Sequence, residues 1–413
     1  MQLIFVRWAI IAIAALPVVY YLAAALSAWG FFRRRANKAD YTPPVSILKP
    51  LKGLERDAYE NLASFCRQDY PEYEVLFAVD DSRDSVVPVV SRLIRDFPRV
   101  PIRLLVGSAI PGLNNKVTKL CRLGRAASHE LLVISDSDMR VKPDYLRSIV
   151  SPFRDPSVGA VTCLYRGITA LNLWSQLEDL HLTTDWLASV LLARKLQGVS
   201  FTFGATMALT RARLAEIGGF EALADCAADD YELGRRIAAR GYRVELVPCD
   251  VQTLCACGTA RAFFQRHLRW GVFIRHCRPW GYAGLLFTKG LPWSLAAAAL
   301  APSRLAAIGC LTVPLAARLA MAFTCGVYGM KDPLLRRRWW LIALHDAVDF
   351  VIWTATLFSN RVSWRGLRFD VRRGRLMRVA QPALRVIPAQ AGIQVGGKDL
   401  RPSASVEAGL SGK

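Results

Sequence analysis

The chain has 413 residues, 53% of them hydrophobic, with a mean hydropathy of +0.24 and a formal net charge of +21. This length allows two or three domains, and the apolar excess is concentrated toward the two ends. Basic residues cluster beside apolar runs, at 33–35, 336–338 and 361–378, and form no known nucleic-acid motif. This placement favours anionic lipid over nucleic acid as the partner. Ten cysteines without a C-x-x-C motif fit no zinc or disulfide framework and indicate free thiols in a reducing compartment.

Residues 8–29 form an uncharged apolar run that is bracketed by tryptophans and followed by three arginines. The run predicts a transmembrane anchor with its C-terminal side in the cytoplasm. Stretches 282–300, 305–330 and 339–358 are further candidate spans. Three full crossings would put the Arg-rich tail outside, so one of them is not expected to be a full span. Charges in the last stretch, His345, Asp346 and Asp349, indicate either a functional intramembrane site or an interfacial segment.

The middle of the chain alternates short apolar runs with helical stretches. Strands are predicted at 45–50, 73–79, 102–106 and 131–134, and helices at 57–68 and 86–96 and in the segment that carries Lys116. This order predicts an α/β domain with a mostly parallel sheet. Farther on, the pattern predicts a helical stretch at 172–197, a strand at 199–210, a short helix at 212–217 and a helix after residue 228. The tail after about residue 380 is predicted to be disordered.

Acidic residues follow two of these strands. Asp136 and Asp138 come after strand 131–134, and Asp81 comes after strand 73–79. Ligands of open α/β sheets bind at the carboxyl ends of strands, and two close carboxylates favour a hard cation such as Mg²⁺ or Mn²⁺. With Lys116 near the start of the intervening helix, the pattern predicts a nucleotide diphosphate held through a metal. The alternative is a solvated Asp-Ser-Asp turn.

Two later segments carry further candidates. Asp229 and Asp230 stand at a helix N-terminus, where one acid caps the helix and the second is available for chemistry. Arg266 and Arg269 share one helical face that suits a pyrophosphate, and Trp270 suits either a sugar or the membrane interface. The alternative for residues 262–280 is a basic amphipathic helix lying on the bilayer.

In order and at regular spacing, these motifs resemble an inverting glycosyltransferase of the GT-A fold, as in glycosyltransferase family 2 and the ceramide glucosyltransferases. The bacterial glycosyltransferases of hopanoid biosynthesis look closer still. The resemblance covers about residues 43–280. It rests on the segments 45–53 and 111–117, on Asp81, on Asp136 and Asp138, on the Asp-Asp-Tyr at 229–231, and on the motif at 266–270.

The resemblance implies a role for each residue. Pro50, Leu51 and Asp81 would cradle the uridine, Lys116 would lie near the phosphates, Asp136 would contact the nucleotide, and Asp138 would bind the metal. Arg269 would stabilise the departing UDP, and Asp230 would be the general base. The phosphate or the acceptor would be served by Arg266, Trp270 and Asp229. Asp229 replaces the glutamate usual in the family, which puts its supporting contact in doubt. The second acid of the D-x-D motif favours the bacterial branch.

The resulting hypothesis is a membrane-bound enzyme that moves N-acetylglucosamine or glucose from a UDP-sugar to a lipid hydroxyl, with bacteriohopanetetrol as the first acceptor. Ceramide or diacylglycerol is the alternative acceptor. A polysaccharide synthase would need more spans, and a membrane scaffold would not need the acids. The expected location is the bacterial inner membrane, multi-pass, with the catalytic domain in the cytoplasm. The domains expected are an anchor (1–32), a GT-A domain (43–260), an interfacial helix (261–281), transmembrane or re-entrant segments (282–358) and a basic, then disordered, tail (359–413).

Overall fold

The computed structural model describes residues 2–33, 41–107, 110, 112–168, 172–255, 257–364 and 367–378. A compact unit ends at Arg378. The tail predicted to be disordered and Pro111 of the 111–117 motif lie outside the described residues.

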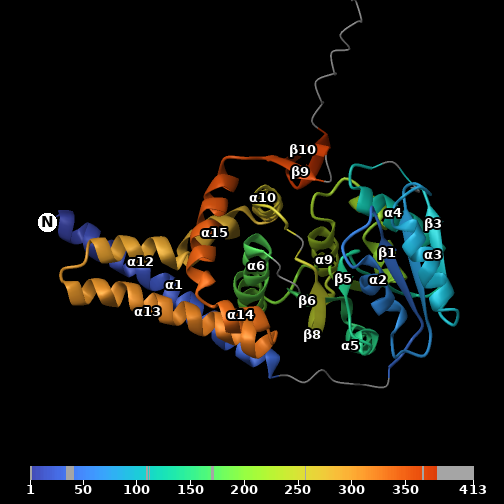
Figure 1. The fold of residues 1–413 in the computed structure, drawn as a ribbon, viewed down its shortest axis with the longest axis horizontal. Coiled ribbons are helices and arrows are strands. Elements are labelled where there is room, and N and C mark those ends of the chain that lie inside the picture. The colour runs from blue at the N-terminus through green and yellow to red at the C-terminus, as the bar shows by residue number, and fades with distance from the viewer. Residues whose placement is uncertain are drawn as a thin grey trace, which may run out of the picture. The chain divides into compact units, whose positions relative to one another are not determined.

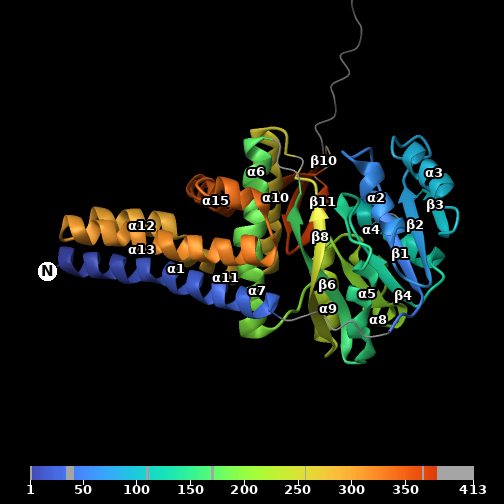
Figure 2. The same ribbon diagram turned by 60° about the horizontal axis from the view of Figure 1, so that its bottom comes forward.

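An eight-stranded sheet in the order β3-β2-β1-β4-β7-β6-β8-β5 forms the centre of this unit (Figures 1 and 2). Neighbours β3, β2, β1 and β4 are parallel, as are β6 and β8, whereas β7 and β5 run antiparallel to their neighbours. The strands are β1 (Val45–Pro50), β2 (Tyr73–Val79), β3 (Ile102–Val106), β4 (Leu131–Ile134), β5 (Met139–Arg140), β6 (Val158–Gly167), β7 (Met207–Thr210) and β8 (Arg243–Thr253). The four strands predicted for the first half are confirmed.

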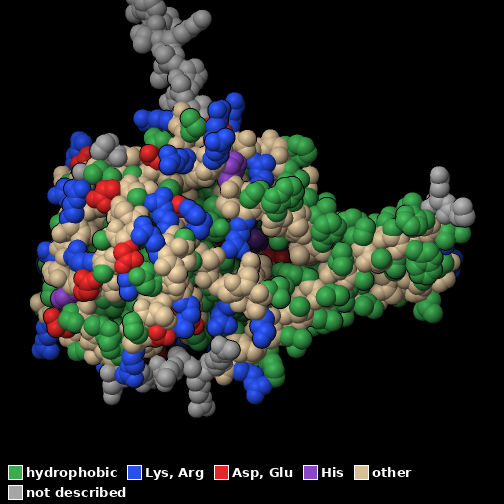
Figure 3. Space-filling model, turned by 180° about the vertical axis from the view of Figure 1, so that it is seen from behind, with side chains coloured by type: hydrophobic (Ala, Val, Ile, Leu, Met, Phe, Trp, Pro, Cys, Tyr) green, Lys and Arg blue, Asp and Glu red, His purple; other side chains and the backbone are tan. Residues whose placement is uncertain are grey.

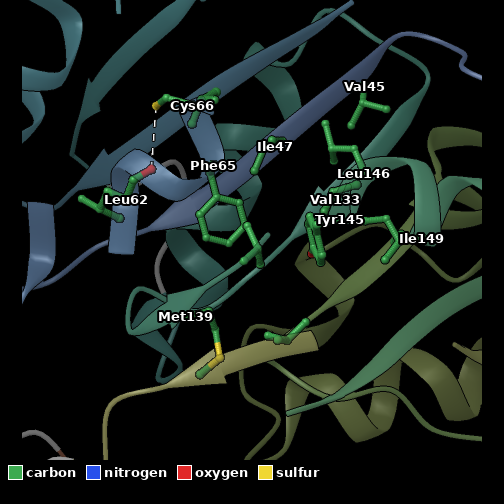
Figure 4. Packing of buried hydrophobic residues seen from close by; sticks show 14 of the residues in the cluster. Val45, Ile47, Leu62, Phe65, Cys66, Val133, Met139, Tyr145, Leu146 and Ile149 are labelled. Atoms are coloured by element: carbon green, nitrogen blue, oxygen red, sulfur yellow. Dashed lines mark hydrogen bonds between the residues drawn. The ribbon is translucent and has the colours of Figure 1, made fainter. Parts of the chain in front are cut away.

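Helices pack on both faces of the sheet, which buries β1 and β4 completely. On one face, Phe65 of α2 packs edge-on against Tyr145 of α5, 5.8 Å away, over Ile47 and Val133 (Figure 4). Apolar side chains of α4 and α9 fill the other face. The helices beside the sheet are α2 (Ala58–Cys66), α3 (Val87–Asp96), α4 (Asn115–Ala126), α5 (Tyr145–Val150), α8 (Arg211–Glu216) and α9 (Asp229–Ala239).

The strand predicted over 199–210 is wrong for most of its length, because only Met207–Thr210 joins the sheet as β7. The residues before it hydrogen-bond to side chains instead of a neighbouring strand. Phe203 N donates to Thr162 Oγ1 at 2.9 Å, and Gly204 N donates to the carboxylate of Asp230. This segment therefore forms a loop at the strand ends. Strands β6 and β8 were not foreseen.

The helical stretch predicted at 172–197 is present, with a π-helical turn in its middle. It consists of α6 (Leu173–Leu180), the π-helical segment η2 (His181–Trp186) and α7 (Leu187–Gln197). Asn172 caps its start by accepting from Ser175 N, and Gly198, at φ 78°, ends it.

Three helices, called the bundle below, pack side by side in both views: α1 (Gln2–Phe32), α12 (Gly290–Ala299) and α13 (Arg304–Ala322), the last continued by the π-helical segment η5 (Phe323–Gly329) (Figures 1 and 2). The segments Ile4–Phe32 and Arg304–Gly329 are long and apolar enough to cross a membrane. With ten residues, α12 is about 15 Å long, half of a hydrocarbon core of about 30 Å. The predicted span over 282–300 is therefore broken into α11 (Pro279–Gly284), η4 (Leu285–Thr288) and α12.

The remaining elements surround the junction between the bundle and the sheet. Helix α10 (Ala260–Cys277) contacts α15 (Leu341–Leu357). Helix α15 follows α14 (Pro333–Arg338) in the chain, and its axis runs across the direction of the bundle (Figure 1). The number of membrane crossings stays a prediction.

The sequence indicated residues 361–378 only as a basic flank of a membrane segment. In the structure, strands of this segment form a small antiparallel sheet. Its strands are β9 (Arg361–Trp364), β10 (Leu367–Arg372) and β11 (Arg375–Arg378). Arg373 and Gly374, at φ 48° and 76°, form the turn between β10 and β11. Buried side chains of this sheet pack on Ala227 and Val272.

Candidate active site

Lys116 links two of the predicted acids. Helix α4 begins after Asn114, whose side chain accepts hydrogen bonds from the backbone amides of Lys116 and Val117. The Lys116 ammonium lies 2.8 Å from Asp136 Oδ1 at the end of β4 and 3.1 Å from Asp229 Oδ2 at the start of α9. Asn114 Nδ2 donates to the other oxygen of Asp229 at 3.1 Å. The residue that departs from the family pattern therefore has two partners in this chain.

Asp230 is held at the start of α9 by two backbone amides. Its Oδ2 accepts from Gly204 N and its Oδ1 from Tyr231 N, both at 2.8 Å. Burial and then the charge of Asp229 raise the pKa of Asp230 to about 6, against the opposing effect of Lys116. The carboxylate is therefore mostly ionised at pH 7 and is a stronger base than an ordinary aspartate.

Gly204 connects Asp136 with Asp230 and was not singled out from the sequence. Its carbonyl accepts from Asp136 N at 3.0 Å while its amide donates to Asp230. A Cβ atom at this position would lie 2.4 Å from Asp136 Oδ2 and 3.1 Å from Lys116 Nζ, so only glycine fits without a shift. A glycine inside an apolar, threonine-rich segment is the sequence signal for such a close backbone approach.

Asp138 lies in a second acidic group. Thr253 Oγ1, opposite β5, donates to Asp138 Oδ2 at 3.2 Å. Burial and then the charges of Glu55 and Asp136 raise the pKa of Asp138 to about 7. Glu55, which the sequence did not indicate, accepts from Ser137 Oγ at 2.9 Å. Carboxylates that share one region are stabilised by a bound cation, and an all-oxygen donor set fits Mg²⁺ or Mn²⁺.

A buried lysine lies beneath this region. The Lys49 ammonium donates to the carbonyl of Asp136 at 2.5 Å and lies 3.7 Å from the ring centre of Phe65. Burial lowers the pKa of Lys49 to about 7, although Asp136 and Asp138 oppose the shift. Lys49 therefore ties β1 to the acidic end of β4.

The residues proposed to hold a uridine follow β1 and β2. Pro50 ends β1, and the buried Leu51 donates its amide to Ala78 O at 2.8 Å. Asp81 is half exposed and pairs with Arg83 at 2.7 Å. Parallel pairing of β1 with β2 and β4 brings all these strand ends to one edge of the sheet.

The three residues of the α10 motif face different partners. Arg266 Nη1 lies 2.7 Å from Glu178 Oε1 of α6, and its charge acts to lower the pKa of Asp138. The Arg269 guanidinium lies 5.9 Å from the ring centre of Trp364 in β9. Arg266 therefore belongs with the acidic group, whereas Arg269 lies against the small C-terminal sheet.

The third residue of the α10 motif, Trp270, contacts two histidines. Its ring stacks on His181 with the ring centres 6.4 Å apart, and the centre of the His267 ring lies 5.1 Å away.

A separate row of aromatic side chains lies near the acids. Tyr165 packs on Trp186 at 4.7 Å, and Trp186 packs on Phe203 at 4.6 Å. Burial, followed by the charges of nearby acids, raises the pKa of Tyr165.

A mostly parallel sheet with helices on both faces, and with a lysine among acids at its strand ends, is the arrangement of an α/β protein that binds its ligand at this edge of the sheet. Residues 9–377 match the model of Glycosyl transferase family 21, and the chain belongs to this family. The predicted α/β fold class and the ceramide glucosyltransferase-like family are confirmed.

Among curated relatives, ceramide glucosyltransferase 1 of Caenorhabditis elegans is 27% identical over 229 residues, which cover 55% of this chain and 49% of the relative. Ceramide glucosyltransferase of Komagataella phaffii is 31% identical over 142 residues, which cover 31% and 28%. The chain thus spans about half the length or less of these relatives. A mannosyltransferase of Pyrobaculum calidifontis, solved with GDP-Man and Mn2+, is 23% identical with a TM-score of 0.49, over 84% of this chain and 98% of the other.

Proposed function

We propose that the protein transfers glucose or N-acetylglucosamine from a UDP-sugar to a hydroxyl group of a membrane lipid, with inversion at the anomeric carbon. The observation that carries the proposal is the placement of Asp230. This carboxylate is fixed by two backbone amides, has a pKa of about 6 and lies beside the paired Lys116 and Asp136.

In this mechanism Asp230 accepts the proton of the acceptor hydroxyl while the hydroxyl oxygen attacks the anomeric carbon. A general base of this kind accelerates the reaction by about 10²–10⁴-fold. The UDP leaves from the opposite side of the carbon, so an α-linked donor gives a β-glycoside. Lys116, Arg266 and Arg269 would offset the negative charge that develops on the diphosphate.

A divalent cation, Mg²⁺ or Mn²⁺, held by Asp138 would act as a Lewis acid on the diphosphate. Asp136 would contact the nucleotide, and Pro50, Leu51 and Asp81 would surround the uridine. The oxygen-only donor set supports a metal, and so do the neighbouring charges of Glu55 and Asp136, which a bound cation would offset.

Two observations support a lipid acceptor: the apolar helices of the bundle, and the ceramide glucosyltransferases among the relatives. The relatives' names favour ceramide as the acceptor. The D-x-D pattern of Asp136 and Asp138 favours bacteriohopanetetrol. A location in the bacterial inner membrane, with the sheet in the cytoplasm, belongs to the same proposal.

The test uses membranes that contain the full-length wild type or Asp230→Ala. Radiolabelled UDP-glucose or UDP-N-acetylglucosamine is combined with ceramide, diacylglycerol or bacteriohopanetetrol, with and without a chelator. A β-linked glycolipid that requires the metal and is lost in Asp230→Ala is expected. Full activity in Asp230→Ala would exclude this base, and the absence of product from every pairing would overturn the function.

A further inference from the structure

Ionisable side chains gather where the bundle meets the α/β part of the chain. They come from η2, α13 and α15 and from the residue before α12. The set, called the junction cluster below, comprises His181, Asp185, Lys289, Arg318, His345, Asp346 and Asp349. None of these residues takes part in the reaction proposed above.

Arg318 occupies the centre of one half of the cluster. Its Nη2 lies 2.6 Å from Asp185 Oδ2 and 2.8 Å from Asp346 Oδ1. His345 Nδ1 lies 3.3 and 3.2 Å from the same two oxygens. Asp185, His345 and Asp346 each place one potential metal-binding atom within 4.8 Å of the others. Because the guanidinium already bridges the two carboxylates, this geometry disfavours a metal ion.

A purely structural role accounts poorly for the cluster. Lys289 pairs with Asp349, so three carboxylates face two permanent cations next to apolar helices. Apolar side chains of similar volume often hold such elements together as well as a buried ion pair does. Ionisable groups in membrane segments are candidates for functional sites, and π-helical turns such as η2 and η5 are frequent at such sites.

The cluster also has unused hydrogen-bonding capacity. Two buried nitrogens of the cluster, His181 Nδ1 and Arg318 Nη1, have no hydrogen-bond partner among the residues that the structure describes, and neither has Nε2 of the neighbouring His267 on α10. The rings of His181 and His267 lie 4.8 Å apart, edge to face, and His267 is 5% exposed. Unpaired buried polar atoms are costly, so donors and acceptors of this kind are expected to meet a polar ligand.

The cluster is partly open to a ligand at its carboxylates and at the ring of His181. Side chains of Asp349, Asp346, His181 and Asp185 remain 14%, 17%, 21% and 23% exposed. Figure 3 shows a hollow where the apolar helices join the rest of the protein, with histidine and acidic side chains inside it.

The surroundings of this hollow are apolar on one side and belong to the α10 motif on the other. Farther out along the bundle (Figure 1), Leu305 and Val19 are 80% and 64% exposed, as suits contact with lipid tails. On the other side, Trp270 stacks on His181. We propose that the junction cluster binds the polar head of the lipid acceptor, and that this head carries several hydroxyl or amide groups. The inference rests on the proposed function and assigns the acceptor's subsite.

The first test compares His181→Gln with His276→Gln in full-length protein reconstituted in nanodiscs. His276 lies on α10, where its Nδ1 contacts Val272 O, and it does not belong to the cluster. His181→Gln is expected to raise the KM for the lipid acceptor about tenfold, the loss of roughly one hydrogen bond, with the KM for the UDP-sugar within twofold. His276→Gln is expected to leave both values within twofold. The effect of His181→Gln should vanish with an acceptor analogue that keeps only the attacked hydroxyl.

The second test needs no variant. A lipid acceptor with a diazirine on its head group is irradiated with the wild type, and peptides containing residues 181–186 or 345–349 are expected to be labelled. If the wild type forms glycolipid, but His181→Gln leaves the KM for the lipid acceptor unchanged and the peptides are not labelled, the inference is overturned and the proposed function stands. Wild type that forms no glycolipid overturns the proposed function, and the labelling still reports whether the cluster binds the head. A stoichiometric metal ion lost in His345→Gln would also overturn the inference.

Discussion

The amide of Gly204 donates to Asp230 Oδ2 at 2.8 Å, while the carbonyl of Gly204 accepts from Asp136 N at 3.0 Å. One glycine thus sets the spacing between the proposed base and the proposed nucleotide-binding acid. The main chain at Gly204 therefore contacts both the carboxylate of Asp230 and the backbone of Asp136.

Replacing Gly204 by alanine is expected to lower kcat by about 10²-fold, because a displacement of about 1 Å at a reacting group has an effect of that size. The added Cβ would lie 2.4 Å from Asp136 Oδ2, and the carboxylate would have to move. Steady-state assays measure the loss. Gly258→Ala is the control, since a Cβ at that position meets no atom within 4 Å. Equal rates in the two variants would contradict a spacing role for Gly204.

Asp230→Asn removes the base but keeps an oxygen that can accept from Gly204 N. We expect kcat to fall about 10²–10⁴-fold, whereas UDP-sugar binding, measured by calorimetry, changes little. A loss of donor binding equal to the loss of rate would show that Asp230 holds the substrate instead of accepting a proton.

The pH profile of kcat/KM is expected to show an acidic limb near pH 6. The active form of Asp230 is ionised and its pKa is raised to about 6, so activity is present above this pH and is lost as the pH falls through it. The residual rate of Asp230→Asn should lack this limb. A limb of the same position in the variant would assign it to another group.

Glu178→Ala is expected to lower the free energy of unfolding by about 1.5–3 kcal/mol, the usual contribution of a hydrogen bond to a charged group. Glu178 is 1% exposed, and its replacement would leave Arg266 without the carboxylate that lies 2.7 Å from it. Chemical denaturation measures the change. Glu60→Ala, which removes the exposed pair with Arg67, is the control and should cost less than about 1 kcal/mol.

The small C-terminal sheet is expected to support the start of α9. Ala227 N donates to Gly374 O, and Leu376 N donates to Asp225 O, both at 2.9 Å. Phe369→Ala removes a side chain that is 3% exposed beneath this contact and should reduce activity and speed proteolysis within 361–378. Leu367→Ala, at a position 36% exposed, should do neither. An unchanged rate in Phe369→Ala would separate the sheet from the site.

The sequence by itself determined the first four strands, the acids at their ends and the long apolar helices. Each of these has a local signal: an apolar run closed by proline or glycine, or a polar pair directly after a buried strand. The spacing of Asp136 and Asp138, taken together with Asp81 and Lys116, predicted a nucleotide site, and this assignment stays a prediction.

Only the tertiary structure decided which distant residues meet. The loop carrying Gly204, predicted as strand, passes over the acids because its amides bond to Thr162 and Asp230. Arg318 meets Asp185 across 133 residues, and β11 lies beside the segment before α9. Such pairings depend on how the sheet and helices pack, and local sequence patterns do not record them because each partner alone has the composition of an ordinary loop or helix.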